Sequence, residues 1–328
     1  MVNKFISRLK SFFGGKKKMP PKNEVIIDNW LERRRNATTT ESMEWSSYQG
    51  KGTNAIKSTD TQAVTDKHEP QTRTVTQYPP RHTVSPPPHA KHKHYNCGSA
   101  KCLSGSIYVL ALFAGDKHWE KAEKQKLLDK LYKAENWIRK EAARYGKNVS
   151  FEHGTFGYDK TINVSVVPGH GTGNEDCRVA HKVMKAVGYS SMGEFYEWFK
   201  KNKQCTNCVV VVFAQGRGRS YAIPYAPEYN MDYFTESCII YEAYEDGTPE
   251  LDSGIAHEIL HCFGAEDLYE TFEKPQIVEQ EAKKHYSNDI MHRLDYDINN
   301  LKIDEFTAWC VGLSDAWKEE FRIFLKKK

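Results

Sequence analysis

A long polar segment near the start of the chain limits where a hydrophobic core can form. Residues 37–94 are rich in Thr, Ser, Gln, Pro and His and contain few aliphatic side chains. Such a segment cannot bury enough apolar surface to offset the entropy lost on ordering it, so disorder is predicted. We therefore divide the chain of 328 residues into an N-terminal segment 1–36, a disordered Pro/Thr/His-rich linker 37–96 and one folded domain, 97–328.

The N-terminal segment is basic at its start. Residues 1–22 hold seven Lys or Arg and no acid, whereas the whole chain has 47 Lys+Arg against 43 Asp+Glu. Its apolar residues are spaced to form one face of a short amphipathic helix: Phe5, Ile6, Leu9, Phe12 and Phe13. Such a helix would suit reversible contact with a membrane surface, and a solvated tail is the alternative. Basic residues interrupt the apolar run, so no signal peptide is predicted.

Composition argues against two classes of protein. No stretch approaches the ~20 apolar residues of a membrane-spanning helix. The formal net charge of +4 argues against a dedicated nucleic-acid binder, which would be much more basic. The eight cysteines occur without a secretory signal, so reduced thiols and a cytoplasmic location are expected.

Apolar patterns after Leu103 predict a single domain of the α/β class. Strands are expected at 107–113, 161–167, 209–213 and 238–241. Helices are expected at 119–145, 176–187, 192–200, 251–263, 303–311 and 315–325. Residues 217–223 alternate as an edge strand does, and 238–241 would be its neighbour.

The stretch from Ser253 to Tyr269 carries the candidate chemistry. On a helix, His257 and His261 lie one turn apart on the same face, about 6 Å along the axis, so both imidazoles can bind one zinc ion. Glu258 is rotated by about 100° from His257. Its carboxylate is therefore placed to take a proton from an activated water rather than to bind the metal. This H-E-x-x-H pattern is typical of zinc peptidases.

A catalytic zinc requires a third protein ligand. Gly264 is expected to end the helix, since Gly accepts the left-handed conformation found there. Asp267 follows three residues later, where the chain has turned back, and its carboxylate is the predicted third ligand. The sequence thus predicts a zinc site made by His257, His261 and Asp267, with Glu258 as general base and acid.

The pattern H-E-x-x-H-x-x-G-x-x-D from His257 to Asp267 resembles the metzincin clan of zinc peptidases. It is similar to the variant with Asp as third ligand that small bacterial proteases of the snapalysin type carry. Residues 263–269 are also similar to bacterial immune-inhibitor-A-like metallopeptidases. Asn288-Asp-Ile-Met291-His resembles the clan's methionine-containing turn, which implies that Met291 packs beneath the metal. Position 293 is Arg where astacin-type enzymes have the tyrosine that some relatives place on the metal.

The resemblance, whose specific motifs cover only 251–292, implies a fold and an activity. The implied fold is a metzincin-like α/β (α+β) domain: a twisted mixed sheet with a backing helix, an active-site helix and a C-terminal helical subdomain. The implied activity is zinc-dependent endopeptidase cleavage of a protein or peptide substrate by a monomer. An extended substrate would pair with a sheet edge above the active-site helix.

Two other functions stay open. The first is a non-hydrolytic, zinc-stabilised module for peptide binding or signalling, against which Glu258 argues because metal binding alone does not need that carboxylate. The second is a proteolytic toxin or defence effector with one intracellular target, which would use the same chemistry.

The cysteines offer two weaker hypotheses. Cys205 and Cys208 form a single C-x-x-C that, together with Cys97 and Cys102, could make a structural zinc site. Unpaired thiols are the simpler interpretation. Cys97, at the boundary between the linker and the domain, could also hold the enzyme latent by occupying the zinc, although the surrounding family motif is absent.

Overall fold

The computed structural model describes residues 98–166, 178–224, 235–271 and 273–325. The predicted segments 1–36 and 37–96, together with Cys97, lie outside the described residues. The described elements follow in chain order: β1 (Gly105–Gly115), α3 (Lys121–Arg144), β2 (Val149–Phe156), β3 (Ile162–Asn163), α5 (Val179–Ala186), α6 (Met192–Asn202), β4 (Asn207–Arg217), β5 (Tyr221–Ile223), β6 (Ser237–Ala243), α7 (Asp252–Cys262), α8 (Gln276–His285), the 3-10 helix η3 (Ile298–Asn300), α9 (Glu305–Val311) and the 3-10 helix η4 (Glu319–Ile323).

A mixed sheet with the strand order β2-β1-β4-β6-β5 forms the centre of the fold, and the short β3 pairs with the end of β1. All neighbouring strands are parallel except β5, which runs antiparallel to β6 at one edge. The central strands β1 and β4 are buried over most of their length. This explains why both appear in the sequence as continuous apolar runs rather than alternating ones.

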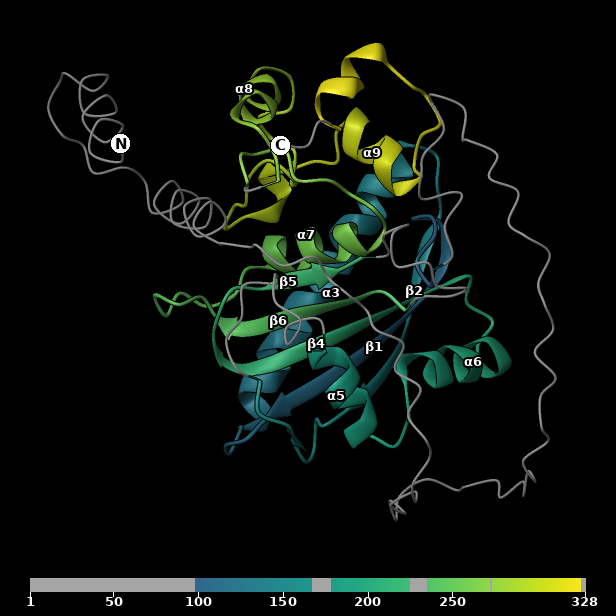
Figure 1. Cartoon of the computed structure of the whole chain (residues 1–328), viewed down its shortest axis with the longest axis vertical. Helices are drawn as coiled ribbons and strands as arrows, with labels where there is room; N and C mark the ends of the chain where they lie inside the picture. The colour runs from purple at the N-terminus through teal and green to yellow at the C-terminus, as the bar shows by residue number, and fades with distance from the viewer. Residues whose placement is uncertain (1–97, 167–177, 225–234, 272, 326–328) are drawn as a thin grey trace, which may run out of the picture.

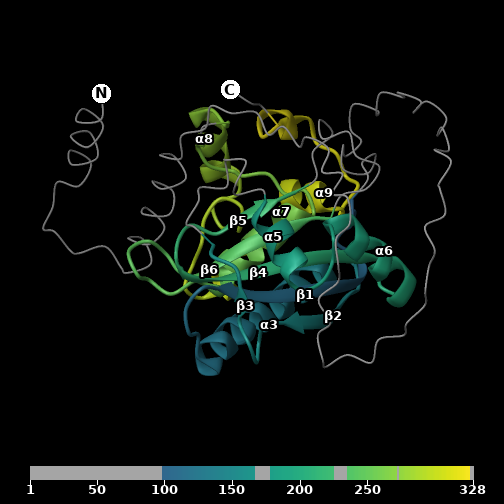
Figure 2. The same cartoon turned by 60° about the horizontal axis from the view of Figure 1, so that its bottom comes forward.

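Helices cover both faces of this sheet. Alternate β1 residues such as Val109 face a core shared with α3, α7 and α9, whereas Tyr108 and Leu110 face a second core shared with α5 and α6. Figure 1 shows α5 and α6 in front of the sheet, α3 behind it and α7 across its upper edge. In both views α8 and α9 lie on the same side of the sheet as α7 (Figures 1 and 2).

Most predicted elements are confirmed, with shifted ends. The predicted strands at 107–113, 209–213 and 238–241 correspond to β1, β4 and β6, and the predicted helices at 119–145 and 251–263 correspond to α3 and α7. Within the predicted edge segment 217–223, only β5 forms the edge strand, while Arg217 ends β4. Its predicted pairing with the 238–241 strand is confirmed.

Two predictions of secondary structure are wrong in extent. The strand expected at 161–167 is reduced to the two residues of β3 among those described. The helix expected at 315–325 is only the short η4. There Phe321 and Phe324 pack against Phe306 at centroid distances of 5.4 and 5.0 Å, so contacts with a distant part of the chain accompany the shorter element.

Two elements were not predicted at all. The strand β2 lies at a sheet edge and exposes alternate polar side chains, so its sequence lacks a long apolar run. The helix α8 buries only Val278 and Ala282, which leaves a weak periodic signal. The coarse α/β prediction with a mixed sheet nevertheless holds.

None of the described helices combines the length and the apolar character that a membrane span requires.

Candidate metal centre

The helix α7 is buried along almost its whole length. Every residue from Ser253 to Cys262 is buried, and the helix packs against α3, β5 and β6. Apolar residues such as Ile255 and Ile259 face the same core as α3. This packing holds His257 and His261, which are 0% and 8% exposed, on a rigid element.

The three predicted ligands converge at one point. The Nε2 atoms of His257 and His261 are 3.0 Å apart. Asp267 Oδ1 lies 3.4 Å from the first nitrogen and 3.2 Å from the second. Among the described residues, only this group of three has the composition and spacing to hold a metal ion.

Backbone carbonyls orient both histidine rings. His257 Nδ1 lies 2.9 Å from the carbonyl oxygen of Ile290, and His261 Nδ1 lies 2.8 Å from that of Ala265. Because a carbonyl oxygen can only accept, each Nδ1 carries the proton, and a neutral ring then presents an unprotonated Nε2 to the centre. Burial lowers the pKa of His257, which favours the neutral ring that a metal needs, although Asp267 opposes this shift.

The donor set fits zinc. Two imidazole nitrogens and one carboxylate oxygen are ligands that catalytic zinc uses, and donors bound tetrahedrally to zinc are about 3.3 Å apart. The three separations observed here are 3.0, 3.2 and 3.4 Å. Three facing lone pairs at these distances repel one another unless a cation or a proton lies between them.

The turn after α7 brings Asp267 back to the histidines. Gly264 has φ +95°, the left-handed conformation predicted for it, and its N–H donates to the carbonyl of His261 at 2.8 Å. The N–H of Ala265 donates to the carbonyl of Leu260 at 3.0 Å, which closes the helix end. Asp267, three residues after this glycine, is 13% exposed at its side chain.

Met291 lies in a tight turn that touches the centre through its backbone. Its side chain is 0% exposed and belongs to the core formed with α3 and α7. Ile290, one residue earlier, supplies the carbonyl bound by His257. The carbonyl of Met291 itself accepts the N–H of Leu268 at 3.0 Å, next to the candidate ligand Asp267. The turn therefore contacts one candidate ligand, His257, and the residue that follows another.

Glu258 lies directly after His257 and is 1% exposed. A second acid, Glu250, is fully buried just before α7 and accepts hydrogen bonds from Tyr244 Oη at 2.6 Å, the Leu251 N–H at 2.9 Å and Ser220 Oγ. Burial raises the pKa of Glu250, and the negative charge of Glu258 adds to this rise. The helix thus carries its candidate general base in a dry environment with a second acid close by.

The other candidate residues are dispersed. Cys102, Cys205 and Cys208 take part in no metal-type cluster of the described residues, and each is a free thiol. Cys97 lies outside the described part of the chain, so its proposed latency role remains a hypothesis. Cys262, next to His261, is buried in the core that α3 also lines. Tyr296, the nearest tyrosine after the turn, is 42% exposed.

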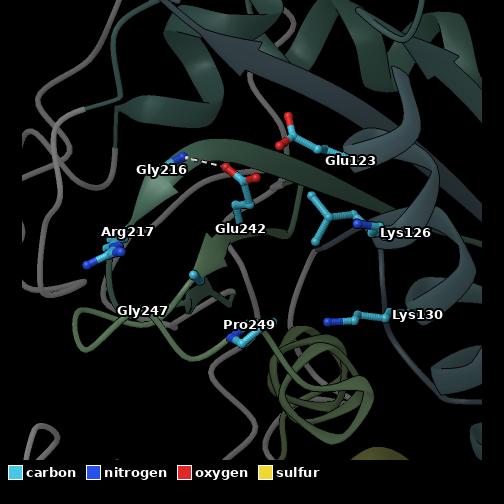
Figure 3. Close-up of a pocket in the computed structure, with 10 residues that line it drawn as sticks. Glu123, Lys126, Lys130, Gly216, Arg217, Glu242, Gly247 and Pro249 are labelled. Atoms are coloured by element: carbon cyan, nitrogen blue, oxygen red, sulfur yellow. Dashed lines mark hydrogen bonds between the residues drawn. The ribbon is translucent and has the colours of Figure 1, made fainter. Parts of the chain in front are cut away.

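A separate cavity lies at the carboxyl ends of β4 and β6. It has a volume of about 370 Å³ and is lined by charges of both signs, among them Glu123, Lys126, Lys130 and Glu242 (Figure 3). Glu242 accepts the N–H of Gly216 at 3.2 Å. None of the three candidate metal ligands lines this cavity, so it is not the metal centre.

Three groups on or near the centre were missed from the sequence. The carbonyls of Ile290 and Ala265 orient the histidine rings, but a backbone carbonyl carries no residue-type signal. Glu250 could have been noticed as an acid directly before an apolar helix, yet its burial was not foreseeable from that position.

No protein-family model matches the chain, and no curated protein matches it. Its function is therefore inferred from its own residues and geometry.

Proposed function

We propose that this protein is a zinc-dependent endopeptidase. The observation that carries the proposal is the convergence of His257 Nε2, His261 Nε2 and Asp267 Oδ1 within 3.4 Å of one another, on a buried helix that also bears Glu258. The resemblance of the same residues to the metzincin motif supports it, as does the buried Met291 in the turn whose Ile290 carbonyl contacts His257.

Different residues of the chain would have different roles in peptide hydrolysis. When bound, zinc supplies Lewis acidity that polarises the scissile carbonyl and makes a water more acidic. Glu258 accepts the proton of the attacking water and returns it to the nitrogen of the leaving amine. His257 and His261 hold the metal through Nε2, while their Nδ1–H groups remain bound to backbone carbonyls.

The sheet offers a site for an extended substrate. The strand β5 is the antiparallel edge strand, it packs against α7, and no described strand pairs with its outer side. An extended peptide that adds to this edge would use backbone hydrogen bonds for affinity, which suits a protein or peptide substrate. We place the scissile bond between this edge and α7, with a monomer as the active form.

A comparison of cleavage products tests the proposal. Zinc-loaded wild type and Glu258→Ala are incubated separately with a cell lysate, and new peptide N-termini are mapped by mass spectrometry. Glu258→Ala should retain zinc, because Glu258 is not one of the three ligands. We expect new N-termini with the wild type and a decrease of at least about 100-fold in their formation with the variant.

The matched control is the zinc content of both proteins after gel filtration. Equal sets of N-termini from both zinc-loaded proteins would contradict a role for Glu258. A folded, zinc-loaded wild type that produces no new N-termini would instead favour the non-hydrolytic binding module.

A further inference from the structure

Asp289 is a buried acid in the turn that carries Met291. Its side chain is 0% exposed. One carboxylate oxygen, Oδ1, accepts the N–H of Met291 at 2.7 Å, and the other, Oδ2, accepts the N–H of Asp304 at 2.7 Å. The carboxylate therefore joins the turn to the residue that precedes α9.

The backbone strengthens the same connection. The Ile290 N–H donates to the carbonyl of Lys302 at 3.1 Å, and the Lys302 N–H donates to the carbonyl of Asn288 at 3.0 Å. The turn is also fixed to α7, because Ser253 Oγ donates to the carbonyl of Asp295 at 2.7 Å. The chain around Asp289 is thus bound on one side to the segment before α9 and on the other side to α7.

The carbonyls of the two residues after Asp289 contact a candidate metal ligand and the neighbour of another. The carbonyl of Ile290 accepts His257 Nδ1–H, and that of Met291 accepts the N–H of Leu268, which follows Asp267. A shift of this short segment would move both acceptors at once.

We propose that Asp289 is a positioning residue of the metal centre, which fixes the Ile290 carbonyl against His257 and the Met291 carbonyl against the loop of Asp267. This inference rests on the proposed function, since it assumes that the three ligands bind zinc. Groups that orient a ligand in this way fix its tautomer, and their loss typically weakens metal binding 10- to 100-fold.

A carboxylate suits this position because two N–H donors point at it. An ionised Asp accepts at both oxygens, whereas Asn accepts at one oxygen and turns an NH2 donor toward the second N–H. Asp289→Asn therefore keeps the volume of the side chain but removes one of the two hydrogen bonds.

The test measures zinc affinity and the tautomer of His257 at pH 8. Zinc affinity is determined by competition with a chromophoric chelator for the wild type and for Asp289→Asn. The tautomer is determined on the zinc-free proteins by ¹⁵N NMR of the imidazole nitrogens. We expect a 10- to 100-fold weaker zinc affinity in the variant, and an Nδ1–H tautomer in the wild type that becomes mixed in the variant.

Glu236→Gln is the matched control. Glu236 is also 0% exposed and accepts backbone N–H groups, from Ser99 at 2.6 Å and Ala100 at 3.0 Å, but these partners lie outside the turn whose carbonyls contact His257 and Leu268. Its zinc affinity should stay within about 3-fold of wild type if buried acids act only locally.

An Asp289→Asn protein that binds zinc as the wild type does, or no more weakly than Glu236→Gln, would overturn the inference. An Nε2–H tautomer of His257 in the wild type would overturn it as well, and this holds even if the variant does not fold. A wild type that binds no zinc would refute the proposed function and, with it, the positioning role of Asp289 in a metal centre.

Discussion

Gly254, in the first turn of α7, is a position at which helix propensity and tertiary packing predict opposite effects of one substitution. Replacing a helical Gly by Ala usually stabilises a protein by up to about 1 kcal/mol. Here a Cβ atom would lie 2.2 Å from Glu250 Oε1 and 2.9 Å from Tyr244 Oη, well inside contact distance. Gly254→Ala must therefore displace the buried carboxylate.

The cost follows from the hydrogen bonds of Glu250. The same oxygen accepts Tyr244 Oη at 2.6 Å and the Leu251 N–H at 2.9 Å, so its displacement weakens both bonds. Each buried donor left without its partner costs about 1–3 kcal/mol. Subtracting the gain of about 1 kcal/mol in helix propensity leaves a net loss near 3 kcal/mol.

Urea denaturation of the zinc-free proteins measures this difference. Ala122→Gly, at an exposed position in α3, calibrates the intrinsic effect of the Ala/Gly exchange and should lose no more than about 1 kcal/mol. If Gly254→Ala proved more stable than the wild type, the close contact with Glu250 and the hydrogen-bond reasoning would both be refuted.

Two further predictions concern buried ionisable groups. Burial raises the pKa of Asp289 to about 7, compared with about 3.9 in an unfolded chain. A raised pKa stabilises the fold fully below pH ~4 and loses that contribution as the pH rises through about 7. The stability of zinc-free wild type relative to Asp289→Asn should therefore be greater by about 3 kcal/mol at pH 5 than at pH 8, and urea denaturation that shows no pH dependence in this difference would contradict it. Lys274 is 3% exposed and donates to Glu266 Oε2 and to the carbonyl of Phe324, both at 2.8 Å. Lys274→Met should lose about 3 kcal/mol in the same assay, because Glu266 and the carbonyl lose a buried charged donor, whereas a change below about 0.5 kcal/mol would show that the pair does not stabilise the C-terminal segment.

Local patterns in the sequence were sufficient to predict the central strands β1 and β4 and the helix α7, which carries the two histidines. Strands β1 and β4 are continuous apolar runs because both of their faces are buried, and that signal is present within a few residues. The spacing of His257 and His261 is likewise local, since one helical turn places both on the same face. The end of the helix is also a local signal, since Gly264 is a residue type that accepts the left-handed conformation.

Elements stabilised by distant contacts gave weaker signals. The edge strand β2 lacks an apolar run because one side of it meets solvent. The 315–325 segment has helical periodicity, yet Phe321 and Phe324 pack on Phe306 and the segment forms only η4. The spacing of apolar residues within one segment does not show which distant residues the segment will pack against.

Local sequence was therefore enough to identify the side chains that could bind a metal and to place two of them on one helix face. How they are held depends on the packed fold, because Ile290 lies 33 residues from His257 and Asp304 lies 15 from Asp289. Contacts over such separations depend on how the sheet and helices pack, and backbone carbonyls and N–H groups can make them at almost any residue type.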